Sequence, residues 1–166
     1  MFFHICQMDD GLRHIRILIS SIDGNHVRVL NDSGHSSHYC WKDDDELLCY
    51  STVRDKGEGY YLYDTHTGLN QIIGPDCLTE DGHPSYLPGA SKLITDTYPD
   101  QYGESSLLLY ACKEEKLTVL DKEFLPVKFC GETRCDLHPR VSPSGKYVCI
   151  DTVKCGQRVM KLFEIM

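Results

Sequence analysis

The chain has 166 residues, enough for one domain core of ordinary size. Its hydrophobic content of 41% and its charged content of 25% are typical of a globular protein. Seventeen Lys and Arg residues against 25 Asp and Glu residues give a net charge of −8, which disfavours binding to nucleic acid or to an anionic membrane surface.

The nine cysteines indicate reduced thiols. Their number is odd and no Cys-x-x-Cys pair occurs, so neither a disulfide framework nor a zinc ribbon is predicted. Apolar runs fall well short of the roughly 20 residues that a membrane-spanning helix needs, and residues 1–6 lack the basic and apolar regions of a secretory signal. We therefore expect a cytoplasmic protein that does not cross a membrane.

The first 37 residues predict strands. Apolar residues alternate at Ile15, Ile17 and Ile19 and again at Val27 and Val29, the pattern of half-buried strands. The turn-forming residues Asp-Gly-Asn (23–25) separate the two runs. No amphipathic helix is predicted here or elsewhere in the chain.

From residue 38 the chain repeats. Three segments beginning at His38, His83 and His138 align without a gap, at spacings of 45 and 55 residues. In each segment a β-type run begins nine residues after the histidine, and a threonine follows five residues later. A second strand-like run comes after each, at residues 60–64, 107–110 and 159–163. The chain is therefore predicted to be an all-β repeat protein.

Four short strands in about 45 residues are typical of a β-propeller blade, whose first strand lies beside the central channel. We predict one propeller segment over residues 1–166: a partial blade at 1–37, blades at 38–82 and 83–137, and a partial blade at 138–166. The second blade carries a loop insertion near residues 98–105. A β-sandwich also accommodates many short strands, but it does not explain the matching histidine-led copies.

The number of blades in the chain allows three ways of completing a propeller ring. Propellers close with four to eight blades, and the chain has two complete blades and two partial ones. It is either a fragment of a longer propeller, an oligomer that closes the ring between copies, or a four-bladed form. We favour the fragment, because the first blade begins midway.

Several stretches resemble a known family. They are Ser-His-Tyr-Cys-Trp (37–41), Asp-Gly-His-Pro-Ser-Tyr (81–86), Thr-Asp-Thr-Tyr-Pro-Asp (95–100), Arg-Cys-Asp-Leu-His-Pro-Arg (134–140) and Ser-Pro-Ser-Gly-Lys (142–146). Together they are similar to bacterial WD-repeat-like propellers related to oligogalacturonate lyase, over about residues 13–165. The resemblance implies the last half of a seven-bladed ring, a manganese ion held near the channel by several histidines and a glutamine, and β-elimination of digalacturonate. No glutamine stands beside the three histidines here.

The repeated histidines are the candidate metal ligands. If their shared position starts the innermost strand, His38, His83 and His138 surround one mouth of the channel. Three neutral imidazoles suit a divalent ion such as Mn, Fe, Ni or Zn, and the resemblance favours Mn. Such an ion would neutralise a uronate carboxylate and acidify the adjacent C–H bond for an unidentified base. Alternatively, each histidine bonds only to the backbone of the turn that precedes its strand.

Two arginines are the candidate substrate-binding residues. Arg134 and Arg140 flank the third histidine, and a guanidinium pairs bidentately with a carboxylate, so we expect them to hold an acidic oligosaccharide. Asp96 and Asp151 share a repeat position and are predicted to cap turns rather than to bind metal.

Two functions follow from these observations. The first is a propeller segment of a carbohydrate-acting, lyase-like protein. The alternative is a non-catalytic propeller scaffold that binds a protein or glycan partner.

Overall fold

A computed structural model describes residues 1–9 and 11–165 of the chain. The chain folds into two compact units, unit 1 at Met1–Thr79 and unit 2 at Glu80–Met166. Within the described residues the secondary structure is almost entirely β, with two single-turn 3-10 helices. The predicted all-β class and the lack of amphipathic helices are confirmed. No helix in the described part of the chain has the length and apolar character needed to cross a membrane.

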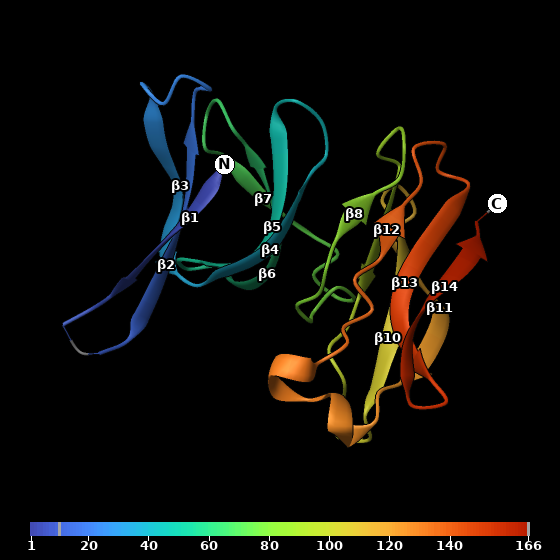
Figure 1. Ribbon diagram of the computed structural model, residues 1–166. Coiled ribbons are helices and arrows are strands. Elements are labelled where there is room, and N and C mark those ends of the chain that lie inside the picture. The colour runs from blue at the N-terminus through green and yellow to red at the C-terminus, as the bar shows by residue number, and fades with distance from the viewer. Residues whose placement is uncertain (10, 166) are drawn as a thin grey trace. The chain divides into compact units, whose positions relative to one another are not determined.

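Unit 1 consists of two antiparallel sheets whose strands pair in chain order (Figure 1). The first sheet contains β1 (Phe2–Gln7), β2 (Arg13–Ser20) and β3 (Val27–Gly34). The second contains β4 (Ser36–Trp41), β5 (Glu46–Val53), β6 (Gly57–Asp64) and β7 (Asn70–Ile73). Ile17 of the first sheet and Leu47, Cys49, Tyr61 and Tyr63 of the second form a fully buried core between them.

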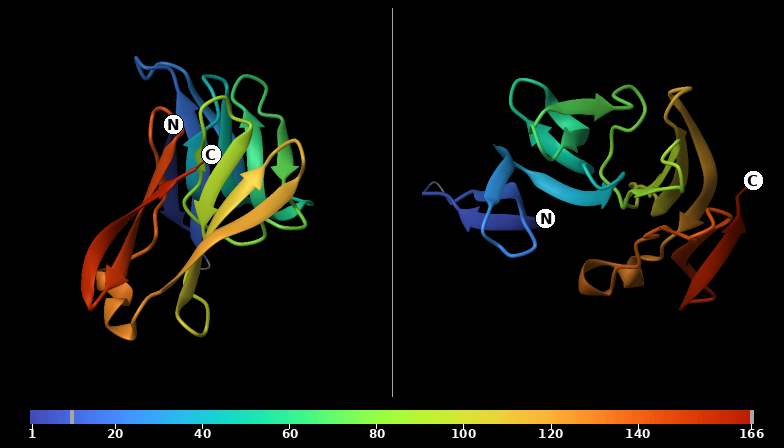
Figure 2. Two further views of the ribbon diagram at one scale, coloured as in Figure 1. Left: turned by 90° about the vertical axis from the view of Figure 1, so that its right-hand side faces the viewer. Right: turned by 90° about the horizontal axis from the view of Figure 1, so that it is seen from above.

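Unit 2 repeats this plan with one four-stranded and one three-stranded sheet (Figures 1 and 2). The four strands are β8 (Ser85–Tyr86), β9 (Lys92–Asp96), β10 (Glu104–Ala111) and β11 (Lys116–Phe124). The short helices η1 (Val127–Phe129) and η2 (Gly131–Thr133) lead to β12 (Arg140–Val141), β13 (Tyr147–Lys154) and β14 (Gln157–Glu164). Ile94 and Leu107 of the first sheet pack with Leu137, Val148 and Ile150 in the core.

The burial of each strand explains its sequence pattern. β5 and β9 lie inside their sheets and are buried on both faces, so they read as nearly continuous apolar runs. β13 has one buried face, and accordingly Val148, Ile150 and Thr152 alternate with more exposed residues. The three β-type runs predicted nine residues after the histidines correspond to β5, β9 and β13, and the runs that follow them correspond to β6, β10 and β14.

The pairing register of the first repeat differs by one residue from that of the other two repeats. The residue eleven positions after each histidine pairs with Tyr39 in β4, with Ser85 in β8 and with Arg140 in β12. Tyr39 is one residue after its histidine, whereas Ser85 and Arg140 are two residues after theirs. β4 is thus offset by one residue, next to an irregularity between Ser36 and Tyr39.

A one-residue offset turns every following side chain to the opposite face of a sheet. His38 also lies inside a strand, whereas His83 and His138 lie two residues before theirs. The equivalence that the gap-free alignment predicts therefore holds for His83 and His138 but not for His38.

Candidate functional site

Gly82 allows the main chain before His83 to lie close to Asp96 at the end of β9. A Cβ atom on Gly82 would lie 1.9 Å from the carbonyl oxygen of Asp96, so no other residue fits against the end of β9. The main-chain N–H of His83 then donates to Asp96 Oδ1 at 2.6 Å, and the imidazole Nδ1 lies 3.0 Å from each carboxylate oxygen. Because a carboxylate accepts, Nδ1 donates its proton to Asp96.

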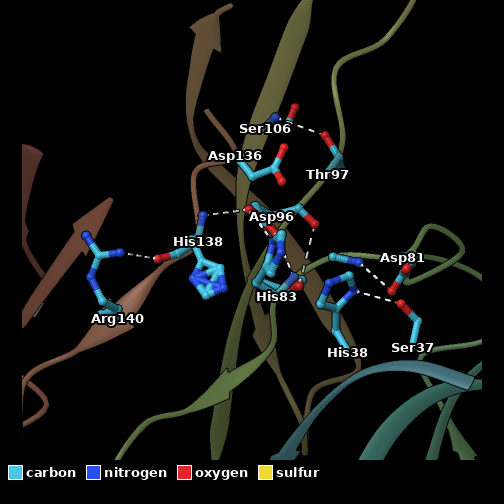
Figure 3. Close-up of polar contacts among 12 residues, drawn as sticks. Ser37, His38, Asp81, His83, Asp96, Thr97, Ser106, Asp136, His138 and Arg140 are labelled. Atoms are coloured by element: carbon cyan, nitrogen blue, oxygen red, sulfur yellow. Dashed lines mark hydrogen bonds and ion pairs between the residues drawn. The ribbon is translucent and has the colours of Figure 1, made fainter. Parts of the chain in front are cut away.

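His138 reaches the same carboxylate from the second sheet of unit 2. Its main-chain N–H donates to Asp96 Oδ2 at 2.8 Å, and its ring centre lies 4.1 Å from that of His83, with the planes at 59° (Figure 3). Its φ of +47° is in the left-handed region, which costs a non-glycine residue about 1–2 kcal/mol. Strained backbone of this kind is often found at functional sites.

Burial is the main cause of an altered pKa at His138. Removal from water, followed by repulsion from His83, lowers the pKa of the His138 imidazole below its usual value. His138 is therefore neutral at neutral pH, with a ring lone pair able to bind a cation. The two adjacent imidazoles and the Asp96 carboxylate are called the histidine site below.

Asp96 is the hub of the histidine site. It is the last residue of β9 and is only 1% exposed. Its two oxygens accept the main-chain N–H groups of His83, which precedes the first sheet of unit 2, and of His138, which precedes the second. Asp96 has a structural role, as predicted, but it holds two remote main-chain segments rather than capping a turn of its own, and Asp151 pairs with Arg140 instead of capping a turn. The sequence did not predict its second role, which is to orient the imidazole of His83.

Arg134 is held on an aromatic ring beside the histidine site. Its Nε lies 2.7 Å from Asp136 Oδ1, and its guanidinium lies 4.6 Å from the centre of the Tyr98 ring. Tyr98 in turn presents its ring edge-on to His83 at 5.9 Å. Burial and then the charge of Asp81 raise the pKa of Tyr98 to about 12, so it remains a protonated phenol. Sequence analysis did not select Tyr98 or Asp136 as site residues, although both lie in stretches that carry the family resemblance.

Arg140 is bound by a carboxylate of its own chain. Both terminal nitrogens donate to Asp151 at 2.8 Å, and one of them also donates to the carbonyl of His138 at 3.2 Å. The hydrogen bond with Arg140 is the main cause of the lowered pKa of Asp151. A substrate carboxylate would have to displace Asp151 to reach this guanidinium, so the substrate-binding role of Arg140 stays a prediction.

An open pocket of about 650 Å³ adjoins the histidine site. His138, Arg134, Asp136 and Asp151 line one part of it, and Arg158 and Met160 of β14 line another. It therefore offers both charges and an imidazole to a polar ligand.

His38 belongs to β4 of unit 1. Its Nδ1 lies 3.0 Å from the hydroxyl oxygen of Ser37. In the part of the chain that the structure describes, no group of three or more His, Cys, Asp or Glu side chains is arranged to hold a metal ion. The geometry brings His83 and His138 together, and the predicted three-histidine metal site stays a prediction.

Comparisons with known proteins identify the fold. No protein-family model matches the chain, and no curated protein matches it in sequence. TolB from Acinetobacter baumannii superposes on 98% of this chain with a TM-score of 0.67 and 13% identity, and the tricorn protease on 97% with a TM-score of 0.60 and 12% identity. Oligogalacturonate lyase in complex with manganese covers 93% of this chain with a TM-score of 0.50 and 10% identity.

The chain spans only part of each of these proteins, namely 37% of TolB, 15% of the tricorn protease and 55% of the lyase. All three are β-propeller proteins. At such low identity the likeness shows the fold and not the activity. The chain therefore has the fold of part of a β-propeller, built from three- and four-stranded antiparallel sheets.

Proposed function

We propose that the histidine site binds a divalent metal ion together with an acidic saccharide, and that the chain is part of an oligogalacturonate-lyase-like protein. The observation that carries the proposal is the pair of imidazoles 4.1 Å apart, one of them oriented from behind by a buried carboxylate. Metal-binding histidines usually donate their second ring N–H to a carboxylate in this way.

The donor set of the histidine site suits a metal ion. Two imidazoles whose nitrogens lie about 2.1 Å from one ion have ring centres roughly 4.6 Å apart at a 90° ligand angle and roughly 5.3 Å apart at the tetrahedral angle. The observed separation of 4.1 Å is shorter, so the two rings would move slightly apart when an ion binds. Nδ1 of His83 is directed at Asp96, and the lowered pKa of His138 leaves that imidazole neutral at neutral pH. Asp96 is buried and its oxygens already accept main-chain N–H groups, so it would orient His83 rather than bind the ion.

The surrounding residues provide for an anionic substrate. The bound ion would act as a Lewis acid that neutralises a uronate carboxylate and weakens the adjacent C–H bond. Arg134, supported by Asp136 and the face of Tyr98, would bind substrate oxygens in the adjoining pocket. The resemblance stated above favours Mn²⁺ as the ion.

Metal binding is tested with the full chain after treatment with a chelator. Titration with Mn²⁺ in a calorimeter should show binding that falls at least about tenfold in His83→Ala and in His138→Ala. His26→Ala, which changes an exposed histidine of unit 1, is the matched control and should bind as the unaltered chain does. His38→Ala tests separately the third ligand that the sequence predicts. Equal Mn²⁺ affinity in a His83→Ala/His138→Ala double variant would exclude the histidine site.

Activity is tested with oligogalacturonate and Mn²⁺. β-Elimination produces an unsaturated uronate that absorbs ultraviolet light, so an absorbance rise that depends on His83 and on added metal would support the lyase function. Metal-dependent binding of oligogalacturonate without an absorbance rise would instead show a binding site that does not catalyse elimination in this chain.

The alternative of a non-catalytic propeller has its own support. The guanidinium of Arg140 is already paired with Asp151, and β14 exposes the apolar side chains of Met160 and Leu162. Met160 and Leu162 are two residues apart and therefore lie on the same face of β14, where they would form part of an apolar contact surface for another protein. Under this alternative the histidine site stabilises the contact between the two sheets of unit 2, and His83→Ala lowers stability without changing metal or saccharide binding.

A further inference from the structure

The last sheet of unit 2 has one strand fewer than the sheet before it. Its strand order is β12-β13-β14, whereas the preceding sheet has the four strands β8 to β11 (Figure 1). Within the described residues β14 pairs only with β13, so the N–H and C=O groups of its other edge meet no strand of the described chain. An edge strand of eight residues with such groups is a template for a further strand.

The register of β14 shows which main-chain groups point to the free edge. The N–H of Ile165 donates to the carbonyl of Lys146 at 2.7 Å, and the pairing of Tyr147 with Glu164 continues the same register. Hydrogen-bonded and non-hydrogen-bonded pairs alternate along antiparallel strands, so the odd-numbered residues of β14 bond to β13. The even-numbered residues direct their N–H and C=O groups to the free edge, and they are Arg158, Met160, Leu162 and Glu164.

The side chains of these four residues also share one face of β14, because side chains alternate along a strand. Met160 is 74% exposed and Leu162 is 66% exposed, and the side chains of Arg158 and Glu164 at the two ends are exposed as well. In chain order this face is positive, apolar, apolar and negative. We call the four residues the β14 stripe.

The β14 stripe is complementary to a second copy of itself. When two copies pair antiparallel about a two-fold axis at Lys161, Arg158 lies opposite the partner's Glu164. Met160 then lies opposite the partner's Leu162, and the symmetry gives each of these pairs twice. Every opposed residue of the stripe directs its main-chain groups to the shared edge, so each pair can exchange two hydrogen bonds. Cross-strand apolar pairs and pairs of opposite charge both stabilise a sheet.

The residue at the two-fold axis does not oppose this pairing. Like charges directly opposite each other destabilise a sheet, and Lys161 would face the partner's Lys161. The Lys161 ammonium, however, lies on the other face of β14, where it is paired with Asp121 and, at 2.7 Å, with Glu123. Two carboxylates of its own copy therefore offset the charge of each lysine.

The charged ends of the β14 stripe are available for a partner. Arg158 donates to the main-chain carbonyls of Thr133 and Arg134, and it forms no ion pair with any residue that the structure describes. Glu164 lies 3.0 Å from Lys146, and both side chains of this pair are 56% exposed. An exposed pair of this kind contributes little to stability, so its carboxylate can be shared with an incoming arginine.

We infer that the free edge of β14 pairs antiparallel with the same edge of a second copy of the chain, which supplies the fourth strand of this sheet. A contact along one strand is small, so we expect a dissociation constant in about the micromolar range. The inference names a partner for the exposed apolar side chains of β14. It does not rest on metal or saccharide binding at the histidine site.

The first experiment measures the oligomeric state of the full chain by sedimentation equilibrium over a range of protein concentrations. Arg158→Glu and Glu164→Arg each place like charges opposite each other, and each should raise the dissociation constant of the dimer at least about tenfold. An equimolar mixture of the two variants should dimerise as the unaltered chain does, because the glutamates of one copy then meet the arginines of the other. Lys116→Glu, the same charge reversal at an exposed position of β11, is the matched control and should change nothing.

The second experiment tests whether the contact is made by the main chain. The N–H of Leu162 points to the free edge, so Leu162→Pro removes no hydrogen bond of the single copy and should leave the circular dichroism spectrum unchanged. The same substitution should abolish the dimer. The N–H groups of Met160 and Leu162 should exchange slowly with deuterium in the dimer and rapidly in Arg158→Glu.

The opposite outcomes overturn the inference. They are a chain that is monomeric at every concentration, a dimer that persists in Leu162→Pro, and a mixture of the two charge variants that stays monomeric. Slow exchange of the Met160 N–H in a monomer would show that another segment covers the edge, which overturns it as well. Binding of Mn²⁺ that requires His83 is measured separately, so the histidine site can fail or hold independently of the dimer.

Discussion

Asp96→Asn is the substitution that most directly tests the construction of the histidine site. It changes one oxygen of the buried side chain to an amide NH₂ group with almost no change of volume. The two carboxylate oxygens accept separate main-chain N–H groups, that of His83 at 2.6 Å and that of His138 at 2.8 Å. Asparagine has one accepting oxygen, so one of these N–H groups must then face another donor.

The free-energy cost follows from these contacts. Loss of a hydrogen bond to a charged acceptor costs about 1.5–3 kcal/mol, and a buried donor left without an acceptor costs about 1–3 kcal/mol. Because Asp96 is 1% exposed, water cannot replace the lost oxygen. We expect a loss of about 3–4 kcal/mol of unfolding free energy, a large part of the 5–15 kcal/mol typical of a domain.

The assay is urea denaturation followed by circular dichroism, with amide hydrogen exchange to locate the effect. The matched control is Asp151→Asn, which breaks the partly exposed pair with Arg140 and should cost about 1 kcal/mol or less. In Asp96→Asn, residues 82–98 and 137–140 should exchange faster while unit 1 keeps its protection. A stability equal to that of the Asp151→Asn control would refute the role of Asp96 as the hub.

Two further predictions concern the same site. Gly82→Ala places a Cβ atom 1.9 Å from a main-chain oxygen and should lower the free energy of unfolding, measured by urea denaturation, by about 2–3 kcal/mol. In the control Gly89→Ala no atom lies within 4 Å of the new Cβ, so only the positive φ should matter and the loss should be about 1 kcal/mol. Equal losses in the two variants would contradict the steric argument. The folded-state pKa of His138 is lowered, so the unfolded chain binds the proton more readily, and stability should fall as the pH drops from about 7 towards 5. His138→Asn, which tolerates a positive φ, should show a shallower pH dependence of the urea midpoint, and an unchanged slope would refute this assignment.

Much of the fold could be predicted because strand formation depends on local sequence patterns. The alternation at Ile15, Ile17 and Ile19 predicts a strand with one buried face, and β2 has Ile17 fully buried in the core. The runs after the three histidines predict β5, β9 and β13 with the correct starting points to within a residue. Repetition of these patterns also indicated blades, because every copy must bury the same face.

The site could be predicted only in part, because side-chain neighbours depend on pairing between distant segments. The alignment treated three histidines as equivalent, but an offset in β4 displaces His38 from the position of the other two. Arg140 was selected for its charge, yet its nearest carboxylate is Asp151 on the paired strand. No sequence pattern shows whether an arginine is already neutralised.

The sequence alone determined that this protein is all-β, that it repeats in blade-sized units, and that a histidine begins three of its segments. Only the tertiary structure decided that His83 and His138 stand side by side, that the Asp96 carboxylate holds both of their main chains, and that Arg134 lines the open pocket beside His138. The physical reason is that strand propensity is a property of neighbouring residues, whereas a site forms where strand register and a buried hydrogen-bond acceptor bring remote residues together.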